Sequence, residues 1–291
     1  MIKFTQLVLT GISVGFIYGL VALGFVLIYK SSKIFNFAQG EMVMVGAFLT
    51  WSLLGLFHMP VLPGLILSFI VAGAVGYGFE RFPFRPMIGQ PILAIIMVTM
   101  AIAVFLRGLA ILLWANFVGI KFPSIIPEQT IYIFNIPFSS VFAWSFLLVF
   151  SLVIGLSLFF QYTRLGLHMR AAAEHHQLAQ SMGIRVTRSI AQSWAIAAVV
   201  STAGGFLLGY IRGIDFGLAN LGLVALAGAL VGGLESFKGA IIGGLIIGVA
   251  ETLTGGYIGR NLKEVVPFVV MVLVVFYKPY GLFGLERIER V

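Results

Sequence analysis

The sequence contains no cysteine and very few charged residues. Without cysteine, disulfide bonds and thiolate metal sites are excluded. Only 10% of the 291 residues are charged and 60% are apolar, whereas an ordinary soluble domain carries about 25% charged residues. With a mean hydropathy of +1.08, the chain lacks the polar surface that a protein needs to face water on all sides. This composition excludes an ordinary soluble domain.

Nine apolar segments follow one another along the chain, and several approach the roughly 20 apolar residues that a spanning helix needs. They cover residues 6–29, 42–57, 61–80, 91–113, 139–161, 189–211, 217–234, 239–256 and 264–278. The pattern predicts an all-α, polytopic membrane protein with about eight to nine transmembrane or re-entrant helices. The first segment exceeds the core of a secretory signal and no A-x-A-like cleavage site follows it, so we expect a retained spanning helix.

The basic residues are divided unequally between the two sets of loops. If all nine segments cross, one side holds Lys30, Lys33, Arg81, Arg85, Arg164, Arg170, Arg185, Arg188, Lys238, Lys278, Arg287 and Arg290. The other side holds Lys3, Lys121, Arg212, Arg260 and Lys263. The positive-inside rule places the larger set in the cytoplasm, which puts the N-terminus outside and the C-terminus inside. This bias explains the net charge of +8 without nucleic-acid binding.

Residues 217–256 contain eleven glycines. Glycine allows two helices to approach closely, but it also suits broken or re-entrant helices that are buried in protein. The sequence leaves open whether this region crosses the membrane twice or dips into it as a hairpin.

The long loop at residues 162–188 lies on the predicted cytoplasmic side. Residues 169–182 are mostly good helix formers, and Gly183 is suited to end the helix. Ala171, Leu178 and Met182 share one face at spacings of i, i+7 and i+11. Such a helix either enters the groove of a partner or packs on its own bundle and the lipid headgroups. His168, His175 and His176 lack the i, i+4 spacing of a helical metal site.

Three stretches resemble the permease of the high-affinity branched-chain amino acid ABC importers. They are "NFAQGE" at 36–41, "RLGLHMRAAAEHHQLAQSMGI" at 164–184 and "GGLESFKGAIIGG" at 232–244, and the similarity covers nearly the whole chain. Family members often carry histidine where this chain has Gln39, and they differ at His175-His176. The first departure leaves the substrate open, and the second leaves the exact ATPase contact open.

The resemblance implies one transmembrane permease domain over residues 1–291, in the cytoplasmic (inner) membrane of a bacterium. It implies a second homologous permease subunit, two cytoplasmic ATPase subunits, an extracytoplasmic substrate-binding protein and an amino-acid substrate, with urea or short amides as the alternative substrate. The chain has no G-x-x-x-x-G-K-[ST] motif, so we expect no cofactor here and ATP use by the partners. The expected coupling residues in the 162–188 loop are Arg170, Ala171, Ala172, Glu174, Leu178, Met182 and Gly183.

Five polar residues are candidates for the substrate pathway: Asn36, Gln39, Glu41, Asn220 and Glu251. Asn36 is also a plausible helix N-cap, and Glu41 complements the positive end of the helix dipole. Residues 213–230 echo residues 34–49, with a polar residue before phenylalanine and then a glycine-rich helix. Because the two stretches lie on opposite sides, they suggest an inverted repeat, which places a substrate path at the repeat interface.

Three further charged residues have an expected place in the membrane protein. Arg107 is expected either to pair with Glu41 or Glu251 and stabilise the bundle, or to mark the outer mouth where its helix rises, because an intramembrane charge is costly unless it is paired or in water. Arg212 and Asp215 are expected on an outer surface that receives the binding protein.

A secondary transporter or channel would share this composition but would transport without an ATPase. A membrane-embedded enzyme would need convergent catalytic or metal-binding side chains inside the segments, and the sequence lacks that pattern.

Overall fold

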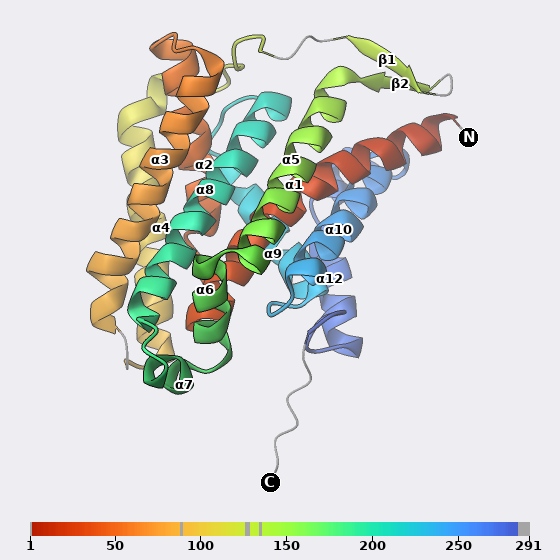
Figure 1. Cartoon of the computed structure of the whole chain (residues 1–291). Helices are drawn as coiled ribbons and strands as arrows, with labels where there is room; N and C mark the ends of the chain where they lie inside the picture. Colours follow the sequence, from red (N-terminus) through yellow and green to blue (C-terminus); the bar gives the residue numbers. More distant parts are fainter. Residues whose placement is uncertain (1, 88–89, 126–128, 134–135, 285–291) are drawn as a thin grey trace.

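The computed structural model describes residues 2–87, 90–125, 129–133 and 136–284, so Arg287 and Arg290 of the predicted cytoplasmic set lie outside the described residues. The elements in chain order are α1 (Ile2–Ser32), α2 (Gln39–Trp51), the π-helix η1 (Ser52–Leu56), α3 (Val61–Phe79), η2 (Glu80–Phe84), η3 (Arg85–Met87), α4 (Ile92–Trp114), η4 (Ala115–Phe117), β1 (Thr130–Ile133), β2 (Ile136–Ser139), α5 (Ser140–Tyr162), α6 (Arg164–Glu174), α7 (His176–Ser181), α8 (Val186–Arg212), α9 (Leu218–Gly232), α10 (Phe237–Tyr257), α11 (Arg260–Lys263) and α12 (Val266–Tyr277) (Figure 1).

The structure confirms an all-α polytopic membrane protein. Six helices in the described part are long and apolar enough to cross a membrane: α1, α3 with η2 and η3, α4 with η4, α5, α8 and α10. The helix α9 is apolar but shorter. The single strand pair in the described residues, β1 with β2, is antiparallel and was not expected from the sequence.

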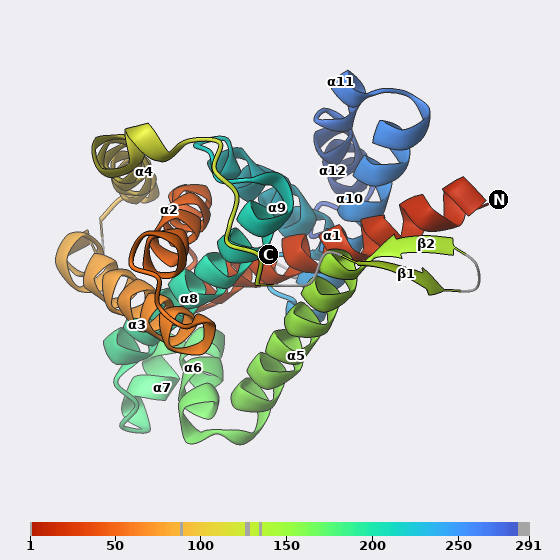
Figure 2. The same cartoon turned by 90° about the horizontal axis from the view of Figure 1, so that it is seen from above.

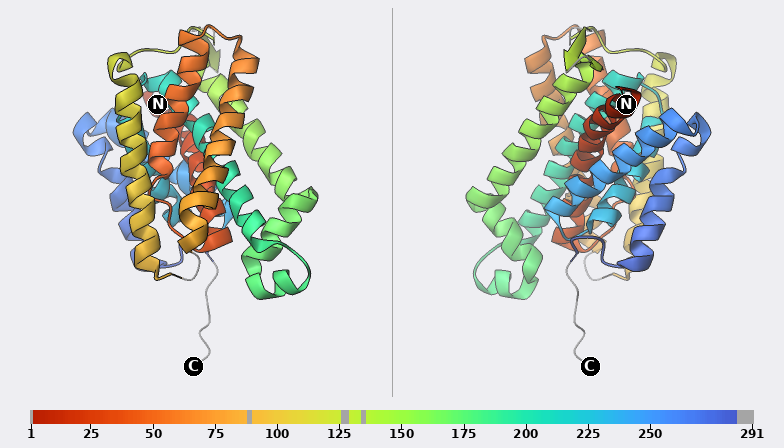
Figure 3. Two further views of the ribbon diagram at one scale, coloured as in Figure 1. Left: turned by 90° about the vertical axis from the view of Figure 1, so that its left-hand side faces the viewer. Right: turned by 90° about the vertical axis from the view of Figure 1, so that its right-hand side faces the viewer.

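The two ends of the bundle carry different structures. The β1–β2 hairpin and the start of α1 lie at one end, called here the hairpin end, whereas α6 and α7 lie at the other, the α6–α7 end (Figures 1 and 3). Side chains of α3, α4 and α5 are largely exposed, since only 22%, 17% and 11% of their most apolar windows are buried. These exposed side chains are apolar, as expected of helices that face lipid.

Helices α1 and α8 form the buried centre and run antiparallel. Gly24 of α1 approaches Ala197 of α8, and Gly204 approaches Val21. On its other side α1 packs on α10, also antiparallel, where a Cβ on Gly244 would lie 2.3 Å from the backbone nitrogen of Gly19. Small residues therefore allow backbone contact along α1.

Two helix triplets, α1–α3 and α8–α10, repeat one arrangement in opposite directions. Each has a long helix, then a short helix, then a third helix that packs on the long helix of the other triplet: α3 on α8, and α10 on α1. Figure 2 shows α2, α3 and α4 on one side of this centre and α10, α11 and α12 on the other. This arrangement agrees with the inverted repeat suggested by the sequence.

The glycine-rich region forms the short helix α9 and the longer helix α10. The turn between α9 and α10 reaches the α6–α7 end, where Glu235 forms a 2.5 Å ion pair with Lys33, one residue beyond α1. The backbone N–H of Leu282 also donates to Val231 there. A shallow hairpin from the hairpin end could not make these contacts, and α10 returns along α1 toward the hairpin end.

Candidate substrate pathway

Asn36 folds the entry to α2 into a tight turn. Its Oδ1 accepts a hydrogen bond from the backbone N–H of Ala38 at 3.1 Å, and α2 begins at Gln39. The cap position is occupied by Ala38, and no side chain caps the helix there. The prediction that Asn36 is the N-cap is therefore wrong, because the asparagine side chain satisfies an amide of the turn two residues on instead of an amide inside the helix.

A chain of buried polar contacts ties this turn to α8. Asn36 Nδ2 donates to Gln39 Oε1 at 3.1 Å, and Gln39 Nε2 donates to Ser201 Oγ at 2.7 Å. Ser201 in turn donates to the carbonyl of Ala197 at 2.9 Å. Asn36, Gln39 and Ser201 are each at most 1% exposed. A satisfied buried network of this kind fixes one arrangement of the two helices, so these two pathway candidates link α2 to α8.

Asp215 forms the same turn before α9. Its Oδ1 accepts from the backbone N–H of Gly217 at 2.5 Å, and α9 begins at Leu218. As at Asn36, the side-chain oxygen accepts from the amide two residues further on, and the helix begins three residues further on. In both turns a phenylalanine directly follows the residue that supplies the oxygen. The sequence echo between 34–49 and 213–230 therefore corresponds to one local structure used twice.

The two short helices meet near their starts. A Cβ on Gly40, the second residue of α2, would lie 2.3 Å from the carbonyl oxygen of Ala219, and a Cβ on Gly222 would lie 2.2 Å from the Cα of Gly40. Neither distance leaves room for a side chain. The starts of α2 and α9 therefore cross in backbone contact at the interface of the two triplets.

Glu41 points away from this crossing toward α4. Its Oε1 pairs with Arg107 at 2.9 Å, while Oε2 has no hydrogen-bond partner among the described residues. Arg107 was expected to pair with Glu41 or Glu251, and the pairing with Glu41 is confirmed. The pair lies between helices, so Glu41 is separated from the other pathway candidates.

A cavity of about 870 Å³ lies beside α1, α9, α10 and α12. Asn220 and Glu251 both border it, together with Asp215 from the turn before α9. Apolar side chains supply much of the remaining wall, among them Val14, Phe142, Leu221, Val224 and Phe268. The structure thus joins two of the five predicted pathway residues in one cavity, while Asn36 and Gln39 lie in the buried network and Glu41 faces α4.

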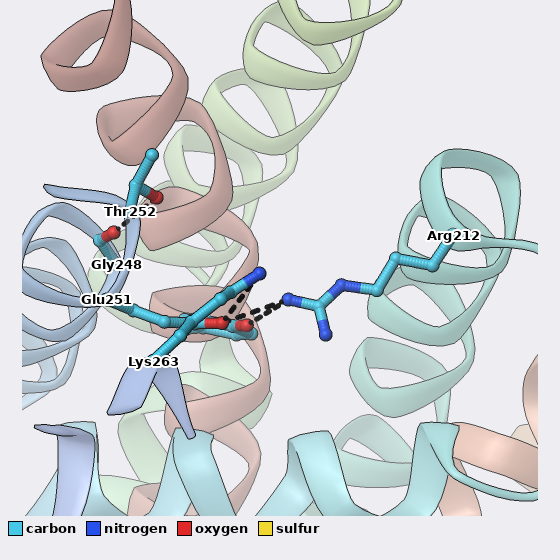
Figure 4. A network of polar contacts seen from close by, with 6 residues as sticks. Arg212, Gly248, Glu251, Thr252 and Lys263 are labelled. Carbon is cyan, nitrogen blue, oxygen red and sulfur yellow. Dashed lines mark hydrogen bonds and ion pairs between the residues drawn. The ribbon is translucent and has the colours of Figure 1, made fainter. Parts of the chain in front are cut away.

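Glu251 is the centre of a charge cluster in this cavity (Figure 4). Its Oε1 lies 3.1 Å from Arg212 and 3.3 Å from Lys263, and the Glu251 side chain is 4% exposed. Arg212 also donates to the hydroxyl of Tyr18 at 3.0 Å. Arg212, at the end of α8, lines the cavity, where its side chain reaches Tyr18 of α1 and Glu251 of α10. Its expected place on an outer docking surface stays a prediction. Two cations thus share one carboxylate, and Asp215 and Glu264 add two further negative charges at the same wall.

The cavity has the chemistry to hold a small zwitterion with an apolar side chain. Arg212 and Lys263 can attract a carboxylate, while Asp215 and Glu264 at the same wall can attract an ammonium group. The volume falls within the roughly 300–1,000 Å³ of small-molecule pockets, which are mostly apolar with a few convergent polar groups. In the described residues no group of three His, Cys, Asp or Glu side chains could hold a metal ion.

Sequence reasoning missed three members of these networks. Tyr18 is fully buried in the middle of α1, where its hydroxyl is a rare polar group in an apolar run. Lys263 was counted only among the basic residues of the smaller set, and Ser201 was not singled out within the segment 189–211. A search for polar side chains at helix centres would have found Tyr18 and Ser201.

The loop at 162–188 forms two helices, α6 and α7, where one was predicted. His175 is extended, with φ −152° and ψ 104°, and it separates them. Ala172 and Ala179 pack with Val186 in a buried cluster, while Leu178 and Met182 are 62% and 81% exposed. The predicted common face of Ala171, Leu178 and Met182 is therefore wrong. A break of a single residue, which lets α7 pack independently, leaves no trace in apolar spacing.

The predicted end of this helical region at Gly183 is confirmed. Gly183 has φ +80°, and the backbone N–H of Ile184 donates to Ala179 at 2.9 Å. This is the glycine-based helix end in which a left-handed residue follows the last turn. At the other end, the Thr163 side chain accepts from the Gly166 N–H and caps α6. The remaining coupling candidates Arg170 and Glu174 are exposed.

Comparison with known proteins places these features in a family. The chain is 30% identical to the high-affinity branched-chain amino acid transport system permease protein LivH of Salmonella typhimurium and 29% identical to LivH of Escherichia coli K12, in each case over 99% of this chain and 98% of the relative. It is 31% identical, with the same coverage, to the corresponding permease protein BraD of Pseudomonas aeruginosa. No solved structure matches the chain. A family model described as the permease component of the branched-chain amino acid transport system matches residues 7–275, and the chain belongs to that family.

Proposed function

We propose that this chain is a membrane subunit of an ABC importer for branched-chain or related hydrophobic amino acids. The observation that carries the proposal is the cavity around Glu251, where charges of both signs border a largely apolar wall. This combination suits a zwitterion with a hydrocarbon side chain. It suits urea or a short amide less well, because such a substrate carries no charge and little apolar surface.

The substrate is received at the hairpin end and released at the α6–α7 end. The orientation proposed is N-terminus outside and C-terminus inside, in the cytoplasmic membrane of a bacterium. It is supported by the positive-inside rule, since Lys30, Lys33 and Arg85 lie toward the α6–α7 end. An extracytoplasmic substrate-binding protein would then deliver the amino acid to the hairpin end.

The driving force comes from ATPase subunits that bind α6 and α7. Leu178 on α7 and Met182 directly after its last residue support this role because they are large, apolar and exposed. A short helix that presents apolar side chains is the form that enters a partner's groove. Two such ATPases and a second homologous permease subunit complete the proposed importer. ATP hydrolysis would move α7 and, through Val186 at the start of α8, the central helices.

The test is leucine uptake and ATP hydrolysis in proteoliposomes that contain the permease subunits, the ATPases and the binding protein. Leu178→Asp and Met182→Asp should reduce leucine-stimulated ATP hydrolysis toward the unstimulated rate while the permease stays inserted. Val118→Asp is the matched control, since Val118 is 44% exposed near the hairpin end. Normal stimulation in both α7 variants would contradict the coupling role, and leucine uptake without any ATPase would contradict the importer class.

A further inference from the structure

A second, smaller cavity lies at the α6–α7 end. Its volume is about 290 Å³, and it is bordered by Glu80, Phe84, Ile95, Ile190 and Trp194. Gln180 of α7 and Val186 at the start of α8 also reach it. We call it the inner cavity, and the cavity around Glu251 the outer cavity.

The inner cavity occupies the position that the inverted repeat assigns to a counterpart of the outer cavity. The outer cavity is bordered by the start of α1, the end of α8, the helix α10 and the start of α12. The inner cavity is bordered by the start of α8, the end of α1, the turn after α3 and the start of α4. Exchange of α1 with α8, α10 with α3 and α12 with α4 relates these walls, while α9 borders only the outer cavity and α7 only the inner cavity.

The inner cavity contains buried polar groups without partners. Glu80 is 1% exposed and Trp194 is fully buried. Neither oxygen of the Glu80 carboxylate, nor the indole Nε1 of Trp194, has a hydrogen-bond partner among the described residues. Arg85 and Arg81 on the same turn attract the carboxylate, but neither forms an ion pair with it in the described part of the chain. A buried carboxylate in this condition is costly unless something binds it.

We propose that the inner cavity is a binding site for the transported amino acid on the α6–α7 side, with Glu80 receiving its ammonium group. The proposal rests on the proposed function and extends it to the release end. An ammonium group supplies the donors that both Glu80 oxygens lack. The indole N–H of Trp194 offers one donor to the ligand's carboxylate, and Phe84, Ile95 and Ile190 surround a hydrocarbon side chain.

Its position gives this site a connection to the coupling helices. Gln180 belongs to α7, and Val186 packs with Ala172 and Ala179 in the cluster that holds α6 and α7 together. Movement of α7 therefore changes the wall of the inner cavity directly. Ligand in the inner cavity and movement of α7 influence one another, because coupling between two sites is reciprocal.

Tryptophan fluorescence of the purified full chain in lipid nanodiscs tests the site. The probes are leucine, 3-methylbutylamine, which keeps the ammonium group, and 4-methylpentanoate, which lacks it. Leucine and the amine should change the emission, and Trp194→Phe should abolish the change. Glu80→Gln should weaken both ligands by roughly tenfold or more, the effect expected from loss of a hydrogen bond to a charged group.

Glu235→Gln is the matched control, since it removes a partly exposed carboxylate at the same end, outside the cavity wall, and should leave binding unchanged. If Glu80→Gln fails to fold, Ile190→Phe fills the cavity without touching the carboxylate and should abolish the response. An equal response to 4-methylpentanoate, or an unchanged response in both cavity variants, would overturn the site and leave a cavity that holds only water. If the full importer takes up leucine but the emission of the purified chain does not change, the inner site alone is overturned. If the emission changes but the importer takes up no leucine, the proposed function is contradicted and the inner site stands.

Discussion

The two short helices α2 and α9 begin with the same turn but lie in opposite surroundings. At α2, Asn36 and Gln39 are buried and continue into α8 through Ser201. At α9, the equivalent Asp215 borders the outer cavity, and Asn220 is exposed beside it. The backbone geometry of the repeat is thus kept, while the side chains around each helix start make one of them a rigid joint and the other a wall of the cavity.

The same contrast holds for the buried carboxylates Glu251 and Glu80. Glu251 is held by Arg212 and Lys263 in the large outer cavity, whereas Glu80 has no such partner in the small inner cavity. The inverted repeat therefore places one buried carboxylate in each cavity, but only that of Glu251 has ion-pair partners among the described residues. The predictions below test how far the two halves differ.

The largest expected effect is at the crossing of the two helix starts. Gly222→Leu should prevent folding, because any Cβ at this position already meets the Cα of Gly40 and a backbone atom cannot give way. Gly108→Leu is the control, since a Cβ there meets nothing within 4 Å. The measurement is the yield of monodisperse protein after detergent extraction. A normal yield of the Gly222 variant would break the claim that both halves depend on this contact.

The next effect concerns the outer charge cluster. Glu251→Gln should lower leucine uptake by roughly tenfold, the size expected from loss of a hydrogen bond to a charged group, because it removes the carboxylate that holds Arg212 and Lys263 at the cavity wall. Uptake in proteoliposomes and the amount of assembled complex are measured together. Glu41→Gln is the comparison, because Glu41 faces α4; its uptake should fall less. Equal losses would remove the distinction between the cavity and the helix interface.

A smaller difference separates the two turns in stability. Asn36→Ala should lower the free energy of unfolding by about 1–3 kcal/mol, because it leaves buried groups of Gln39 and the turn unpaired. Asp215→Ala should cost less, since water in the outer cavity can replace the lost acceptor. Thermal unfolding in detergent, monitored as the loss of monodisperse protein, shows which of the two variants is less stable. The reverse order would contradict the contrast between the rigid joint and the cavity wall.

The smallest effect is expected for the ion pair between Lys33 and Glu235. Both side chains are partly exposed, at 38% and 21%, and such pairs contribute only about 0–1 kcal/mol. Glu235→Gln should therefore leave thermal stability nearly unchanged. A large loss of thermal stability would show that the contact between the end of α1 and the α9–α10 turn depends on this ion pair.

The sequence predicted the class of the protein well because that depends on long apolar runs. The nine segments correspond to the described helices α1–α5, α8–α10 and α12, and the repeated turn was visible as two similar strings. The sequence could not predict which charged side chains pair, since Arg212 and Glu251 come together only because α8 and α10 both pack on α1. It also missed the inner cavity of Glu80, which depends on contacts between segments far apart in the chain, and the break at His175, because a break of one residue leaves no trace in apolar spacing.

We propose that the two cavities serve one path and that rigid-body motion driven by the partner ATPases opens them in turn. The absence of native cysteine makes a direct test of this proposal simple. Asn220→Cys places a thiol in the outer cavity and Thr187→Cys places one in the inner cavity. Their reaction rates with a small thiol reagent are compared in the assembled importer without nucleotide and with ATP analogue bound. The account predicts that the two rates change in opposite directions between these states; rates that rise or fall together, or do not change, would contradict it.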